Sequence, residues 1–345
     1  MSEQNGHNYE RALAALSWGH PVYCRTDQAP DQSPKGLRLF HSYDCCAQEY
    51  WRNHPLQEKE KTILLLGDGK YAAVLLERGL LANVYGPERR AHYHVYGDWK
   101  DFCRNHHQLE ITLGVDREVS DRDCLYFHGD DWNQDSGLLS RADRIILCSD
   151  DEEENLQRLQ ALRRYFPHQG QVHLRSYSRI PGECVFGTPA QMYTAELVMA
   201  SRLTRAARAM HQIYADSAEY PVPSWEELSE FLRQSNVAAA DHLLTKVRIL
   251  LKDDALTTLD VDLCARAYEC YREASEEEKS ALWSIEHVRW MRFHSFYNWT
   301  YDAVRDNEAR RHPLMIPYED LPYAEQRKDA YGWELLEALS RSEAW

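Results

Sequence analysis

Short apolar runs alternate with helix-length stretches from residue 61 onward, and this alternation limits the fold more than any other feature of the sequence. The stretch at 152–166 has strong 3.6-residue periodicity. Strands separated by helix-length crossovers predict a parallel sheet with helices on both faces. We therefore expect an α/β fold with a doubly wound parallel sheet. Its strands are predicted at 62–66, 92–96, 124–127, 144–148 and 172–176, with an added edge strand at 185–187.

A glycine-rich turn directly follows the first of these strands. Gly67, Gly69 and Ala72 have GxGxxA spacing in the sequence LLLGDGKYA. In such a turn the first glycine permits the tight bend, the second lets the backbone approach a pyrophosphate, and the small third residue allows close helix–strand packing. The helix N-terminus then offers N–H donors to the phosphates. These features predict a Rossmann-like nucleotide-binding domain, with Asp98 as the candidate ribose ligand, although it lies later than usual.

Two motifs carry a resemblance to a known family. The GDGKYA turn and the sequence LCSDDEEENL at 147–156 together resemble the NAD-binding domain of potassium-uptake regulators, the TrkA-N family, over about residues 61–180. The resemblance implies that NAD(H) or another adenine nucleotide binds as a regulatory ligand. Two alternatives stay open: the domain keeps the fold without the cofactor, and the acidic run at 150–154 stabilises the start of a helix through its dipole.

The second half of the chain, from Pro189, has a helical pattern. Helices are expected at 192–214, 238–251, 261–273 and 281–297. A capping box at 224–227 is expected to open one more helix. No low-complexity linker separates this half from the predicted sheet, so we expect the two to pack together. The predicted parts are an N-terminal segment (1–60) that packs on a Rossmann-like domain (61–190), a helical connector (191–255) and an α-helical C-terminal domain (256–345).

Residues 282–329 have the densest aromatic and charged pattern in the chain. A helical EHVRW at 286–290 is followed by WTY at 299–301 and by HPLMIPY at 312–318. The same blocks occur in this order in the ryanodine-receptor (RyR) repeat domain, which also occurs in bacterial proteins, and residues 262–335 resemble it. Asn298 and Asp302 replace the glycines of the family's turn, and asparagine tolerates the positive φ that such a turn can require.

The resemblance to the RyR repeat implies recognition of a nucleotide-derived signal. An exposed aromatic ring can stack on a base, and arginines can bind phosphate through forked hydrogen bonds. The alternative is that the aromatic residues form the core of a small domain. The candidate ligand-binding residues are His242, Lys246, Trp299, Tyr301, Arg305 and Arg311.

The charge balance limits the class of partner. With a net charge of −15, the 345-residue chain is unsuited to long nucleic acid, which requires a basic face. A few local arginines are enough for a small anionic ligand. No stretch reaches the ~20 uncharged apolar residues of a membrane helix, and the first residues lack the features of a signal peptide. We therefore expect a cytoplasmic protein that does not insert into membranes.

The nine cysteines have irregular spacings and no CxxC pair. This pattern predicts neither a disulfide framework nor a metal site. Reduced, buried thiols are the favoured interpretation for those in apolar runs.

An enzymatic site is the main alternative to a binding site. His128 and Asp131 follow a predicted strand, where α/β proteins place their sites, and this pair can bind a divalent cation or act as acid and base. The sequence contains no GxSxG, GxxxxGK[ST] or HExxH motif. Binding is therefore favoured over catalysis.

The favoured hypothesis is a bacterial regulatory protein, of a defence-associated kind, that senses NAD or a nucleotide-derived signal. Two alternatives remain. One is an NAD-dependent enzyme acting near His128 and Asp131. The other is an interaction scaffold with vestigial nucleotide pockets, which assembles as a homo-oligomer or with an effector partner.

Overall fold

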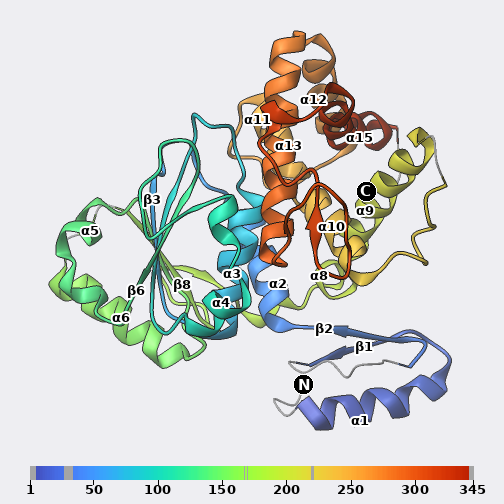
Figure 1. The fold of residues 1–345 in the computed structure, drawn as a ribbon. Coiled ribbons are helices and arrows are strands. Elements are labelled where there is room, and N and C mark those ends of the chain that lie inside the picture. Colours follow the sequence, from blue (N-terminus) through green and yellow to red (C-terminus); the bar gives the residue numbers. More distant parts are fainter. Residues whose placement is uncertain (1–4, 27–33, 167, 169, 219–220, 342–345) are drawn as a thin grey trace.

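A seven-stranded parallel sheet forms the centre of the computed structural model, which describes residues 5–26, 34–166, 168, 170–218 and 221–341 (Figure 1). The strand order is β5–β6–β4–β3–β7–β8–β9. From β3 the chain adds strands in one direction, then returns to β7 and adds strands in the other, as in dinucleotide-binding α/β folds. The strands are β3 (Thr62–Leu66), β4 (His92–Tyr96), β5 (Gly114–Val115), β6 (Cys124–His128), β7 (Arg144–Leu147), β8 (Gln171–Arg175) and β9 (Cys184–Phe186). All six predicted strands are confirmed to within one residue at each end, and the two-residue β5 was not predicted.

Helices cover both faces of the sheet, as the alternation predicts. Leu76 and Ile63 share the cluster on one face, and Leu159 and Leu64 share the cluster on the other. Because β3 is covered on both sides, four of its five residues are buried, which explains its continuous apolar sequence. The helices are α2 (Ser42–Asn53), α3 (Gly69–Ala82) and α4 (Lys100–Asn105) on the first face, and α5 (Ser136–Arg141) and α6 (Glu152–Tyr165) on the second.

The N-terminal segment divides into two parts. Helix α1 (Asn5–Ala15) and the parallel strands β1 (Val22–Arg25) and β2 (Leu37–Phe40) enclose a small cluster of their own, and Figure 1 shows them to one side of the molecule. Helix α2 instead contributes Tyr50 and Trp51 to the core beneath the sheet, with the Trp51 indole donating a hydrogen bond to the Leu75 carbonyl at 2.7 Å. The part of residues 1–60 that packs on the sheet therefore begins at Phe40, the last residue of β2, and continues through α2.

The second half is helical, but two predicted helices are interrupted. The helix expected at 192–214 is broken at Ala200, whose φ is +46°, and the one expected at 238–251 is broken at His242. The Ser224 N–H donates to the Glu227 carboxylate as a capping box predicts, but the Glu227 N–H donates to the Ser224 carbonyl rather than to its hydroxyl. These residues form a turn, and the helix begins later, capped by Ser229. The helices are α7 (Pro189–Met192), α8 (Ala195–Met199), α9 (Ser201–Ser217), α10 (Glu230–Asp241), α11 (Leu243–Leu251), α12 (Val261–Glu273), α13 (Glu276–Phe296), α14 (Tyr323–Gln326) and α15 (Tyr331–Ser340).

The two halves pack together, as expected, and α13 joins them. Phe293 and Phe296 at its C-terminal end belong to the cluster beneath the sheet, whereas Trp283 near its start belongs to a helical cluster. Arg292 of α13 donates to the Asp123 carboxylate and to the Leu80 carbonyl, each at 2.8 Å. No helix among the described residues is both long and apolar enough to cross a membrane.

Candidate functional site

The glycine turn lies at the carboxyl end of β3, beside β7, where the direction of strand addition reverses. Gly67 and Gly69 have φ values of +142° and +89°. A Cβ on Gly67 would lie 2.3 Å from the Ser149 backbone nitrogen, and a Cβ on Gly69 would lie 2.5 Å from the Asp150 carboxyl group. The turn therefore needs glycine both for its φ values and for close approach, and the approaching groups belong to the segment after β7. Ala72 is fully buried where α3 meets the sheet.

The first N–H groups of α3 already have a partner. The Asp150 carboxylate accepts hydrogen bonds from the backbone N–H of Lys70 at 3.0 Å and of Tyr71 at 2.9 Å. These are the donors that a phosphate takes at a helix N-terminus. In the acidic run, Asp151 caps α6 by accepting from the Glu153 N–H, as the dipole interpretation anticipates, whereas Asp150 caps α3.

Asp98 lies near the glycine turn, two residues beyond β4. Its backbone N–H donates to the Asp68 carboxylate at 2.8 Å, and its own carboxylate is exposed and pairs with Lys100 at 3.3 Å. The Lys100 N–H and ammonium hydrogen bonds lower the pKa of Asp98. The fold thus brings Gly67, Gly69 and Asp98 together at the carboxyl ends of the parallel strands. Backbone N–H groups there donate to the carboxylates of Asp150 and Asp68.

His128 is the last residue of β6, so it also lies at the carboxyl ends of the strands. Its ring stacks on Tyr96, with centroids 4.4 Å apart, and its Nε2 lies 3.0 Å from Nδ1 of His94. Burial lowers the pKa of both histidines, that of His94 to about 4. His128 and Asp131 both line an open hollow. The hydrogen-bonding neighbour of the His128 ring is thus His94, while the carboxylates of Asp135 and Asp116 raise the His128 pKa against the larger effect of burial.

The six residues predicted from the C-terminal pattern fall into two separate groups. His242 and Lys246 are fully buried, with His242 Nε2 2.8 Å from the Val84 carbonyl and Lys246 paired with Glu286 at 2.7 Å. Burial lowers the pKa of both. The other group follows the end of α13, ten residues beyond Glu286, or about 15 Å along a helix.

In this second group, Trp299 is buried and stacks on Phe231 of α10, with ring centroids 5.2 Å apart. Tyr301 is exposed, Arg305 donates to Asn307, and Arg311 pairs with Asp302 at 2.9 Å. Trp299 is thus a core residue in this arrangement. Asn298 has a φ of +61°, a positive value that asparagine tolerates, as expected for this turn.

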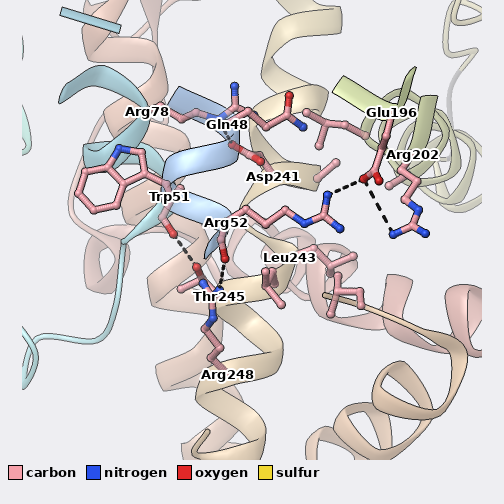
Figure 2. Close-up of a pocket in the computed structure, with 16 residues that line it drawn as sticks. Gln48, Trp51, Arg52, Arg78, Glu196, Arg202, Asp241, Leu243, Thr245 and Arg248 are labelled. Atoms are coloured by element: carbon pink, nitrogen blue, oxygen red, sulfur yellow. Dashed lines mark hydrogen bonds and ion pairs between the residues drawn. The ribbon is translucent and has the colours of Figure 1, made fainter. Parts of the chain in front are cut away.

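A pocket between the two halves was not predicted from the sequence (Figure 2). Its cavity has a volume of about 90 Å³ and opens to solvent. Leu203, Leu243 and Leu259 contribute apolar surface. Six charged residues line it, each from a different helix: Arg52 (α2), Arg78 (α3), Glu196 (α8), Arg202 (α9), Asp241 (α10) and Arg248 (α11). We call it the arginine pocket.

Five of the six charged residues form two ion-pair groups across the junction. Arg52 pairs with Glu196 at 2.5 Å, and Arg202 approaches the same carboxylate oxygen at 3.9 Å (Figure 2). Arg78 pairs with Asp241 at 2.8 Å. Four arginines against two carboxylates leave two positive charges in excess, in a chain whose net charge is −15.

Arg248 closes one end of the pocket. It donates to the Leu256 carbonyl and to the Arg52 carbonyl, and burial lowers its pKa. Its guanidinium therefore connects the helical half to the end of α2. No local sequence motif marks this pocket, because its charged residues come from six helices that meet only in the folded chain.

Comparison of the chain with protein-family models, with curated proteins and with solved structures finds no match. The geometry of the described residues is therefore the basis on which a function can be proposed.

Proposed function

We propose that this protein is a cytoplasmic regulatory sensor that binds a small anionic ligand of the nucleotide class in the arginine pocket. The observation that carries the proposal is the convergence of four arginines from four helices, Arg52 and Arg78 from beneath the sheet and Arg202 and Arg248 from the helical half. Guanidinium groups bind phosphate through paired hydrogen bonds.

Glu196 indicates how a ligand enters. Its carboxylate lies between Arg52 and Arg202, and the longer contact, at 3.9 Å, is the weaker one. A ligand phosphate presents the same kind of oxygen acceptors as this carboxylate, with more negative charge. The phosphate therefore competes for Arg202 first, while Leu203 and Leu243 offer apolar surface to a base or ribose.

The position of the pocket supports a regulatory role. A ligand that contacts α2 and α3 on one side and α9 and α11 on the other stabilises one arrangement of the two halves relative to others. Such a ligand shifts the protein toward the arrangement that it binds more tightly, by an amount set by the difference in its affinity for the two arrangements. The resemblances to the TrkA-N and RyR families support a nucleotide-derived ligand.

The second candidate site is the glycine turn, with NAD or another adenine nucleotide as ligand. The strand order and the two positive-φ glycines favour it. Binding there requires the Asp150 carboxylate to leave the N–H groups of Lys70 and Tyr71. The arginine pocket needs no such displacement of a helix cap, and it is the favoured site.

Thermal-shift measurements with ATP, NAD, ADP-ribose and cyclic oligonucleotides test the proposal. A ligand at 100 times its Kd stabilises a folded protein by about 2.7 kcal/mol. We expect at least one nucleotide to raise the Tm, and Arg202→Ala to abolish that shift. Arg208→Ala is the matched control, because Arg208 lies on the same helix and pairs with Glu226 outside the pocket. No shift with any nucleotide would contradict the proposal and favour the scaffold.

A further inference from the structure

A cluster of nitrogen and sulfur donors lies at the β8–β9 edge of the sheet, on the face that α2 covers. His173 of β8 and Cys184 of β9 are partners in parallel register, so their side chains project from adjacent positions on one face. His54, the residue after α2, packs edge-on against His173, with ring centroids 4.8 Å apart. One ring nitrogen from each histidine and the Cys184 Sγ all lie within 4.8 Å of one another.

The surroundings of His173 resemble those of a metal-binding histidine. The Tyr50 hydroxyl lies 3.0 Å from Nδ1, and the Gln171 side-chain oxygen lies 3.2 Å from Nε2. Histidines that bind metals usually keep a hydrogen bond on the nitrogen that does not coordinate, and this bond fixes the ring. A ring nitrogen of His173 that binds an ion gives up one of these two contacts, and the remaining contact keeps the ring oriented.

The charges around the cluster permit a cation. The nearby Arg144 guanidinium is neutralised by Glu60, to which it donates two hydrogen bonds at 2.8 and 2.6 Å. The Glu49 carboxylate is 9% exposed and has an oxygen (Oε2) without a hydrogen-bond partner among the described residues.

We propose that His54, His173 and Cys184 form a binding site for a divalent metal ion of Zn²⁺ type, completed by water or by Glu49. Two imidazoles and one thiolate are donors that Zn²⁺ uses, whereas Mg²⁺ and Ca²⁺ require oxygen ligands. Coordination replaces the Cys184 S–H bond by an S–Zn bond and releases the proton to water. With metal–ligand bonds of about 2.0–2.3 Å, the three donor atoms close inward from their present separation.

The experiment is a Co²⁺ titration of the full chain, because cobalt replaces zinc and reports a bound thiolate by charge-transfer absorption. We expect the wild type to develop this band and Zn²⁺ to displace it. Cys184→Ser should remove the band, and His54→Gln should weaken Co²⁺ binding by at least about tenfold. Tyr50→Phe removes the supporting hydroxyl and should weaken binding by about 10- to 100-fold.

Two matched controls keep the test specific. Cys270 is an exposed free thiol on α12, and His107 is an exposed histidine outside the cluster. Cys270→Ser and His107→Gln should bind Co²⁺ as the wild type does. Circular dichroism of each metal-free variant establishes that it is folded. The proposal is overturned if the wild type binds no Co²⁺, if the band survives Cys184→Ser, or if Cys270→Ser removes it.

Discussion

Replacement of Asp150 by alanine tests whether this side chain occupies the phosphate position of the glycine turn. Asp150 accepts two hydrogen bonds, from the N–H groups of Lys70 and Tyr71 in the first turn of α3. Loss of a helix cap costs about 0.5–2 kcal/mol, typically about 1. Because Asp150 is exposed but makes two such bonds, we expect Asp150→Ala to lower the free energy of unfolding by about 1–2 kcal/mol.

The neighbouring residue supplies the control for this variant. Asp151 caps α6 through a single hydrogen bond from the Glu153 N–H at 2.8 Å, so Asp151→Ala should cost about 1 kcal/mol or less. Urea unfolding followed by circular dichroism measures both as a lower midpoint with an unchanged slope. If Asp150→Ala unfolds at the wild-type midpoint while Asp151→Ala does not, the two bonds contribute nothing and the reasoning is refuted.

The same variant should also change binding of anions. Asp150→Ala frees the Lys70 and Tyr71 N–H groups and removes a negative charge that repels phosphate. If the glycine turn can accept a nucleotide, the affinity for NAD should rise in Asp150→Ala and stay at the wild-type value in Asp151→Ala. An affinity that is unchanged in both variants would show that the turn is a structural element.

Three further perturbations follow from buried and strained groups. Burial lowers the pKa of His294 to about 3, below the usual value of ~6.5 for histidine. Between these values the unfolded chain binds a proton that the folded chain does not, so this histidine lowers the free energy of unfolding by about 1.4 kcal/mol for each unit that the pH drops below ~6.5. When urea midpoints are measured from pH 7 to 5, His294→Leu should lose stability less steeply than the wild type, and an unchanged slope would contradict the assignment. Glu286 pairs with Lys246 and Arg289 in the core, so Glu286→Gln should cost about 3–5 kcal/mol in urea unfolding, far more than the exposed control Glu269→Gln. Asn298 has a φ of +61°, so Asn298→Ala should be less stable than Asn298→Gly by about 1 kcal/mol, and equal urea midpoints would refute strain at this turn.

The sheet was predictable because its signal is local. Buried parallel strands have continuous apolar sequences, and β3 reads TILLL between a lysine and a glycine. The breaks in the second half have no such signal, since Ala200 takes a positive φ that alanine rarely adopts and His242 interrupts an apolar run. Local sequence pattern therefore predicts where helices and strands occur better than it predicts where they break or end.

The sites depend on contacts between distant parts of the chain. The glycine spacing predicted a tight bend at Gly67 and a close approach at Gly69, but the group that approaches Gly69, the Asp150 carboxylate, lies about 80 residues further on. In the arginine pocket, Arg52 and Arg248 are 196 residues apart and meet only because α2 and α11 pack together. Sequence pattern also could not separate an exposed ring from a buried one. Trp299 was a candidate for stacking on a base, but it is buried and stacks on Phe231.

The most direct test of the central claim is an equilibrium titration of ATP into the wild type, Arg202→Ala and Asp150→Ala, with any nucleotide that stabilises the protein more strongly used in its place. If the arginine pocket is the ligand site, the wild type and Asp150→Ala bind with similar affinity, and Arg202→Ala binds at least about tenfold more weakly, a difference of about 1.4 kcal/mol. If Arg202→Ala binds as the wild type does while Asp150→Ala binds more tightly, the ligand lies at the glycine turn and the claim is contradicted.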